Sequence, residues 1–223
     1  MSTKHTHNEG AEVVTEVISK SEAFFTNYGK KLIYGITAIV ILAGAYLAYY
    51  KFVQLPNIAE AQEQLFPAEE KFRAEEYELA LNGDGNILGF AQVIEDYGKK
   101  AGEAVYFYAG VCELQLGNFE NAISYLKSYK GDNSTLKARA TACIGDAYVE
   151  LNELEKSLTY FEEAAEIADN SFAAAYLLKA GIVSEELGNN EDAIKYYKQI
   201  KDNYSQSYEG YEIDKYISRI EAK

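Results

Sequence analysis

The sequence is poor in the residues on which most enzymes and metal proteins depend. Its 223 residues include two histidines, two cysteines, two prolines and no tryptophan. Both histidines, His5 and His7, lie in a polar stretch at the N-terminus. Two cysteines cannot form a disulfide scaffold or a four-thiolate metal site, and no glycine-rich phosphate loop, Ser/His/Asp set or metal-ligand spacing is present. We therefore expect no enzyme, no cofactor and no small-molecule substrate.

Positive charge is also scarce. The chain has 21 Lys and Arg residues against 35 Asp and Glu residues, which gives a net charge of -14. A surface this acidic repels phosphate backbones, so nucleic acid is not an expected partner. Proline is rare, while Ala, Leu, Glu, Lys and Tyr are frequent, and this composition favours helix over a turn-rich β fold. The sequence thus predicts an all-α protein.

One segment stands apart by its lack of charge. Residues 32–50 are 19 positions without a charged side chain, and as a helix they would span about 28 Å, close to the thickness of a bilayer core. Lys30, Lys31 and Lys51 bound this run, with tyrosines near both ends. A buried soluble helix and a cleavable signal peptide are the alternatives, but the run is long for both. We expect a single uncleaved transmembrane anchor over residues 32–54.

The basic residues beside the anchor predict its orientation. Lys20, Lys30 and Lys31 lie on its N-terminal side and outnumber the basic residues close to its other end. This bias points the N-terminus to the cytoplasm and the domain from residue 55 onward to the outside of the membrane.

Residues 1–31 then form a cytoplasmic tail. Residues 1–10 are polar and we expect them to be disordered. Apolar and small side chains recur at helical spacing over 11–29 and predict an amphipathic helix; they are Val14, Val17, Ile18, Ser21, Phe25 and Tyr28. Within it, the stretch 13–28 either has no partner, lies on the membrane, or contacts another protein.

The region after the anchor repeats itself. Gly110, Gly145 and Gly181 fall in register at intervals of 35 and 36 residues. A turn follows seven residues after each glycine, and a small residue and then a large one follow the turn. The turns are Gly117-Asn118, Asn152-Glu153 and Gly188-Asn189, the small residues are Ala122, Ser157 and Ala193, and the large ones are Leu126, Phe161 and Tyr197. Small residues let paired helices approach closely, and Gly or Asn suits a left-handed turn.

These recurring positions resemble the tetratricopeptide repeat family. The resemblance implies a solenoid of helix hairpins, although no unit carries the family's Trp or its terminal Pro and the second unit has Asn152 and Ser157 at its turn and small-residue positions. We expect three such units over 103–204.

A degenerate first hairpin and a capping helix complete the expected solenoid. The sequence around Tyr97 is similar to that around Tyr204, three periods later, so residues 55–102 would form a fourth hairpin whose first helix runs over 58–81. Residues 205–223 have an apolar and a polar face and predict a C-terminal capping helix. The expected architecture is all-α, with one transmembrane helix and about four hairpins.

The two cysteines lie in the first helices of adjacent units. Cys112 and Cys143 are 31 residues apart and fall on different faces of their helices. We interpret them as small buried apolar residues rather than a disulfide.

The concave face of such a solenoid is the expected binding surface. It is lined by the first helices of the hairpins, where residues that face neither the paired helix nor the next unit are free to bind a protein. By register these candidates are Phe107, Tyr108, Val111, Leu114, Arg139, Asp146, Glu150, Leu178, Lys179, Ile182 and Glu186. The alternative for Phe107 and Tyr108 is that they pack against the first hairpin or the capping helix.

The layout as a whole resembles the YfgM-like proteins of bacteria. That resemblance implies a single-pass protein of the inner membrane with a periplasmic repeat domain. It also implies an accessory subunit of the Sec translocon that meets exported clients beside a membrane-anchored periplasmic chaperone of the PpiD kind. The alternative is a structural scaffold of another envelope complex, such as secretion, gliding or outer-membrane assembly machinery.

Overall fold

The structure, a computed structural model, describes residues 6–168 and 170–222. Helices dominate these residues, and no strand forms among them. The expected all-α class is therefore confirmed. The chain divides into two compact units, Met1–Pro56 and Asn57–Lys223, which are described in turn.

The first unit is essentially one long helix. Helix α1 covers Thr6–Tyr49 and continues into the π-helical turn η1, Tyr50–Gln54. The helical run Thr26–Arg73 contains an 18-residue window with a mean hydropathy of 2.0, none of which is buried. Among the described residues this is the one helix long and apolar enough to cross a membrane. The expectation of disorder over residues 1–10 is wrong for Thr6 to Gly10, which belong to α1; residues 1–5 lie outside the described part.

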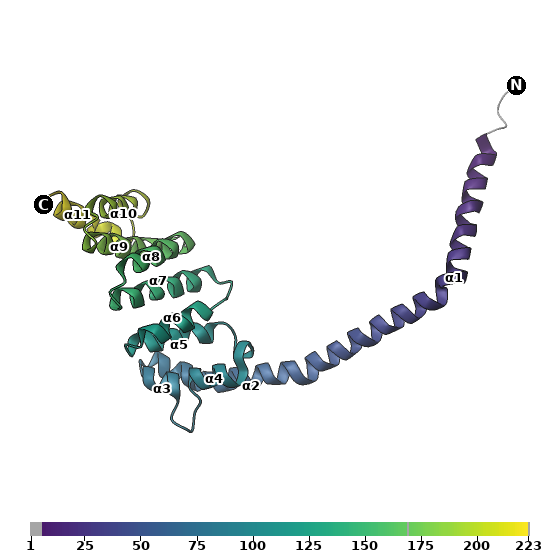
Figure 1. Ribbon diagram of the computed structural model, residues 1–223, viewed down its shortest axis with the longest axis horizontal. Helices are drawn as coiled ribbons and strands as arrows, with labels where there is room; N and C mark the ends of the chain where they lie inside the picture. Colours follow the sequence, from purple (N-terminus) through teal and green to yellow (C-terminus); the bar gives the residue numbers. More distant parts are fainter. Residues whose placement is uncertain (1–5, 169, 223) are drawn as a thin grey trace. The chain divides into compact units, whose positions relative to one another are not determined.

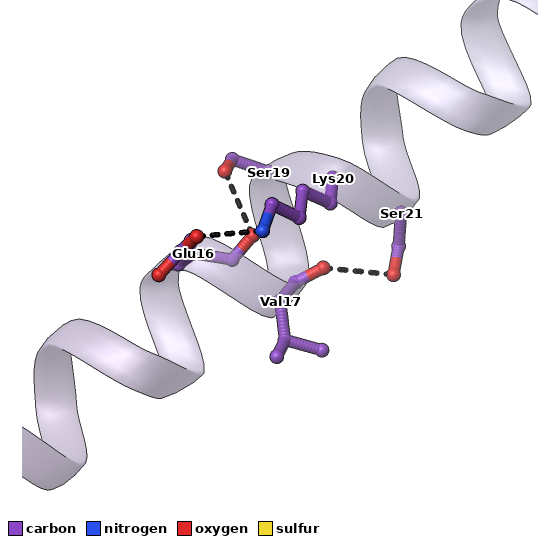
Figure 2. A network of polar contacts seen from close by, with 5 residues as sticks. All are labelled: Glu16, Val17, Ser19, Lys20 and Ser21. Carbon is purple, nitrogen blue, oxygen red and sulfur yellow. Dashed lines mark hydrogen bonds and ion pairs between the residues drawn. The ribbon is translucent and has the colours of Figure 1, made fainter.

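Before the apolar run, α1 carries an apolar stripe beside polar side chains that are satisfied within the helix. Val13, Val17 and Ile18 are more than half exposed. Figure 2 shows the polar contacts around Val17: Lys20 pairs with Glu16 at 2.6 Å, and the hydroxyl groups of Ser19 and Ser21 donate to carbonyl oxygens one turn earlier. These bonds satisfy the polar groups locally, while the valine and isoleucine side chains beside them stay exposed.

The second unit is a stack of helices (Figure 1). Its helices after the anchor run are α2 (Leu55–Arg73), α3 (Tyr77–Asn82), α4 (Phe90–Tyr97), the 3-10 turn η2 (Gly98–Ala101), α5 (Ala104–Gln115), α6 (Phe119–Ser128), α7 (Ser134–Glu150), α8 (Leu154–Ala168), α9 (Phe172–Glu186), α10 (Asn190–Asn203) and α11 (Tyr208–Glu221). Helices α5 and α6, α7 and α8, and α9 and α10 pack as three successive hairpins. The three predicted repeat units are these hairpins.

Glycines allow the two helices of each hairpin to approach closely. A Cβ atom at Gly110 would lie 2.6 Å from Cγ of Leu126, and one at Gly145 would lie 2.7 Å from Cε1 of Phe161. At Gly181 the same atom would lie 2.2 Å from Cε1 of Tyr197. Each glycine thus faces the large residue sixteen positions later, which is buried. The register predicted from the sequence is confirmed by these three contacts.

The turns inside the hairpins share one geometry. Gly117, Asn152 and Gly188 have φ values of 81°, 57° and 80°, in the left-handed region that Gly and Asn adopt most readily. In the first turn, the N–H of Asn118 donates to the carbonyl of Glu113 at 2.9 Å, and that of Gly117 donates to the carbonyl of Leu114 at 3.2 Å. The other two turns repeat this pair of bonds, which is the Schellman pattern that closes a helix.

The segment before α5 is more broken than predicted. The expected helix over 58–81 is wrong, because α2 ends at Arg73 and α3 begins at Tyr77. Glu75 adopts a φ of 60° and closes α2, although glutamate gives no sequence indication of such a turn. The interruption brings Phe72 within 5.8 Å of Tyr77 and 6.1 Å of Phe90, measured between ring centroids. These aromatic rings therefore pack around the break between α2 and α3.

Helix α11 closes the C-terminal end of the stack, as predicted for a capping helix. Its buried residues Ile213, Ile217 and Ile220 pack against α9 and α10. The guanidinium of Arg219 pairs with the carboxylate of Glu185 on α9, which also accepts a hydrogen bond from the Tyr197 hydroxyl at 2.7 Å. Apolar burial and one polar cluster thus fix the cap to the last hairpin.

Candidate protein-interaction site

A groove runs along α7 between α5 and α9, the first helices of the three hairpins. Two contiguous hollows of about 550 Å3 and 520 Å3 form it. They share Leu114, Gln115, Asp146 and Lys179. The first hollow is also lined by Gly117, Phe119, Val149, Glu150, Phe161, Ile182, Val183 and Glu186, and the second by Val111, Thr135, Arg139, Ala142, Cys143, Phe172 and Tyr176. We call this combined surface the α7 groove.

The α7 groove brings together eight of the eleven candidates named from the sequence. They are Val111, Leu114, Arg139, Asp146, Glu150, Lys179, Ile182 and Glu186. Most of these eight residues lie one, four or five residues after the glycine of their repeat, or two residues before it. These positions form one face of each first helix because an α-helix repeats every 3.6 residues.

Phe107 and Leu178 do not belong to this surface, and the expectation that they are free to bind is wrong. Both lie three residues before their repeat glycine. Phe107 is only 3% exposed and packs among Ala122, Ile123 and Leu126 of α6, whereas Leu178 packs against the core formed by α9, α10 and α11. One residue step turns a side chain by about 100° around a helix, which is enough to move it from the groove to the core.

Tyr108 occupies a position equivalent to groove residues but is partly covered by helices α2 and α4. Its ring centroid lies 5.0 Å from that of Phe72 on α2 and 5.6 Å from that of Phe90 on α4. The alternative stated above therefore holds for Tyr108, since it packs on the helices that precede the repeats. Tyr108 is excluded from the binding surface by its neighbours rather than by its own register.

Several groove residues were missed by sequence reasoning. Gln115 and Cys143 share register positions with Glu150 and Lys179, so the repeat alignment contained the information needed to find them. Phe119 begins α6 and Phe172 begins α9, and both line the groove from helix ends where periodicity gives no indication.

An ion pair crosses the middle of the α7 groove. The Nζ atom of Lys179 on α9 lies 2.5 Å and 2.8 Å from the two carboxylate oxygens of Asp146 on α7. The same ammonium group lies 5.5 Å from the centroid of the buried Phe161 ring, a cation–π contact. Both partners of the pair keep about a third or more of their side-chain surface exposed, so a ligand could reach them without unfolding the hairpins.

Among residues 6–168 and 170–222 no three His, Cys, Asp or Glu side chains gather in a way that could hold a metal ion. Cys112 and Cys143 are free thiols. Burial raises the pKa of Cys143 to about 11 and that of Cys112 to about 12, so neither is a ready nucleophile at neutral pH. What the groove presents is apolar surface, hydrogen-bonding groups and charge.

Comparison with known proteins agrees with the repeat architecture. Sequence profiles described as tetratricopeptide repeat match residues 104–133, which cover α5 and α6, and residues 144–208, from α7 to the start of α11. Residues 104–133 and 144–208 therefore carry tetratricopeptide repeats. No curated protein sequence gives a significant match. The tetratricopeptide repeats thus coincide with the hairpins whose first helices line the α7 groove.

Solved structures of MamA share this fold. Two crystal structures of MamA superpose with TM-scores of 0.51 and 0.53 at 17% and 16% identity, over 69% and 74% of this chain and 91% and 87% of theirs. A MamA RS-1 ArsTM double mutant gives a TM-score of 0.56 at 17% identity, over 80% of this chain and 96% of its own. At these identities the likeness shows the arrangement of helices alone.

Proposed function

We propose that the chain is a membrane-anchored, non-enzymatic protein-interaction module whose α7 groove holds an extended segment of a partner protein. The observation that carries this proposal is the groove itself, which is lined by the first helices of all three repeat hairpins. It exposes apolar side chains such as Ile182, which is 41% exposed, beside charged groups on the same face. A surface with both properties suits a peptide segment better than a buried cofactor.

The length of the groove supports an extended occupant. On α7, lining residues run from Thr135 to Glu150, fifteen helical steps apart, and therefore span about 22 Å of helix at 1.5 Å per residue. An extended chain covers that distance with about seven residues. This is long enough for several side chains of a partner to contact the three helices at once.

The apolar run within Thr26–Arg73 supports the membrane anchor, and the basic residues Lys20, Lys30 and Lys31 support a cytoplasmic N-terminus. Labelling with an impermeant maleimide on intact cells tests the orientation. In a background without native cysteines, Asn82→Cys should react and Ser2→Cys should not. The reverse pattern would place the repeat domain in the cytoplasm.

In its finer form, we propose that this module is an accessory subunit of the Sec translocon with a periplasmic repeat domain. It would act beside a membrane-anchored chaperone of the PpiD kind on exported proteins. The layout of tail, anchor and acidic repeat domain supports this assignment, as in the YfgM-like proteins that the chain resembles. An anchor would hold the α7 groove near the channel exit and so raise its effective concentration towards emerging chains.

Co-purification tests the groove and the partner together. The full-length protein carries an affinity tag, is extracted in mild detergent, and its bound proteins are identified by mass spectrometry. Channel subunits and a PpiD-like chaperone should be enriched with the wild type and lost with Ile182→Arg, which places a charge on the exposed apolar surface. The matched control is Tyr211→Arg on α11, which is 73% exposed and lies outside the groove.

The possible outcomes test the translocon assignment and the role of the groove separately. Enrichment of a different envelope machine, still dependent on Ile182, would favour the scaffold alternative and contradict the translocon assignment. Partners retained by Ile182→Arg would show that the α7 groove is not the interface.

A further inference from the structure

The charges of the α7 groove are divided between its two ends. Glu150 and Glu186 lie at the end where α7 and α9 terminate, and both are exposed. Within the described residues neither side chain takes part in an ion pair. Arg139 lies towards the opposite end, near the start of α7, where its guanidinium stands 5.9 Å from the ring centroid of Phe107.

The ion pair in the middle of the groove does not change this distribution of charge. Asp146 and Lys179 neutralise each other through two short hydrogen bonds. The groove therefore has two unpaired negative charges at one end and one positive charge at the other. Gln115, at the register position of Glu150 and Glu186, adds an amide group beside the two carboxylates.

The helix ends add to the same pattern. Helices α5, α7 and α9 all terminate at the acidic end of the groove. The C-terminus of a helix carries a partial negative charge from its unpaired carbonyl groups, and this favours cations. The carboxylates and the helix C-termini therefore both favour a positively charged group at the acidic end of the groove.

Apolar side chains lie next to this acidic end. Leu114, Phe119, Val149 and Ile182 line the same hollow as Glu150 and Glu186. A long basic side chain matches this combination, because its methylene stem can cover apolar surface while its charged head reaches carboxylates. Arginine adds a planar guanidinium that can bond to two carboxylates at once.

We infer that the partner segment held in the α7 groove carries a basic side chain, which pairs with Glu150 and Glu186, beside apolar residues that contact Leu114 and Ile182. This inference rests on the proposed function, since it specifies the chemistry of the segment that the groove binds. The occupant is a protein segment rather than a small cation, because the apolar surface and the length of the groove extend well beyond a single charged group.

Binding of designed peptides to the full-length protein in detergent tests the inference. Three labelled peptides share the core Leu-Ala-Leu-Ala-Leu and differ only at two flanking positions, which carry Arg, Gln or Glu. Fluorescence anisotropy should rank their affinities in that order. Two partly solvated ion pairs correspond to a preference of about 2- to 30-fold for Arg over Gln, and the preference should shrink in about 1 M salt, where charges are screened within about 3 Å.

The protein carries a net charge of -14, so a general attraction for basic peptides must be separated from the groove. The test variant is Glu150→Gln with Glu186→Gln. Its matched control is Glu155→Gln with Glu163→Gln, which removes the same charge from two exposed positions of α8 that do not line the groove. The preference for Arg should disappear in the test variant and persist in the control.

Three other results would overturn the inference. They differ in whether they also contradict the proposed function of the groove. If all peptides bind equally and Ile182→Arg abolishes binding, the groove is a binding site without a basic preference, and only the inference fails. If the control loses the preference as much as the test variant, the effect comes from the overall field of the protein. If no peptide binds, or binding survives Ile182→Arg, the proposed function of the groove fails as well.

Discussion

Replacing Gly145 tests the helix packing on which the whole solenoid depends. A Cβ atom at this position would lie 2.7 Å and 2.8 Å from two ring carbons of Phe161, whereas carbon atoms in contact prefer about 3.5–4.0 Å. Phe161 is 1% exposed and lines the first hollow of the α7 groove. The ring or one of the helices must therefore move by about 0.8 Å to accept even a methyl group, when the shorter preferred distance is taken.

The size of the effect follows from two opposing contributions. Gly→Ala in a helix normally stabilises by about 0.5–1 kcal/mol, because alanine loses less backbone entropy. Overpacking a tight core costs about 1–3 kcal/mol. Gly145→Ala should therefore destabilise by about 1–2 kcal/mol, and Gly145→Leu by more than about 3 kcal/mol, because the larger side chain cannot be placed without separating α7 from α8.

Thermal melts of the second compact unit, residues 57–223, followed by circular dichroism, measure this effect. For a domain of this size about 1 kcal/mol shifts the melting temperature by about 2–4 °C, so Gly145→Ala should melt about 2–8 °C lower and Gly145→Leu lower still. The control is Lys137→Leu, an exposed position on the same helix, which should stay within about 0.5 kcal/mol of wild type. A rise in melting temperature for Gly145→Ala would refute the close approach, since only the helix-propensity gain would then remain.

Three further predictions concern a buried hydroxyl, an ion pair and the two thiols. Ser184→Ala should stabilise by about 0.5–1.5 kcal/mol in the same melts, because the buried Ser184 hydroxyl finds no hydrogen-bond partner among the described residues. Arg219→Ala should speed hydrogen exchange in α11 more than in α5, because it removes the ion pair with Glu185; uniform acceleration would contradict this local role. Burial raises the pKa of Cys112 to about 12 and of Cys143 to about 11, above the value of about 8.5 for an unfolded thiol, so the urea midpoint should fall as pH rises from about 9 to 11. Alanine at both cysteines should reduce that fall.

The regular part of the fold could be predicted because its determinants are local and repeated. A helix glycine, a left-handed turn seven residues later and a large residue nine further on are each a direct requirement of one tight hairpin. Three copies of that pattern fix the register without any long-range information. The segment before α5 lacks such a pattern, since Glu75 closes α2 with a φ of 60° and its residue type does not distinguish it from a residue in a helix interior. Phe72, Phe90 and Tyr108, whose rings are far apart in sequence, pack together beside the break between α2 and α3.

The candidate site could be predicted in outline but not to the single residue. Positions two and three residues before the repeat glycine differ by one helical step, and they separate groove from core. In the third unit this pair is Lys179 and Leu178, where the polar residue identifies the groove side. In the first repeat hairpin, α5 and α6, the pair is Tyr108 and Phe107, two aromatic residues that give no such contrast. The periodicity of α5 alone could not decide between them, because most of its faces are apolar.

The packing of Phe107 and Tyr108 within the fold changes which substitutions can report on binding. Truncating both would remove the contacts of Phe107 with α6 and of Tyr108 with Phe72 and Phe90. A large-to-small change of a buried aromatic such as Phe107 costs about 3–5 kcal/mol. A loss of partner binding in such a variant would report unfolding of the first repeat rather than a lost interface. Glu150, Ile182 and Glu186 avoid this ambiguity because they are exposed and line the groove. A change in binding at these positions, with an unchanged melting temperature, therefore reports on the groove itself.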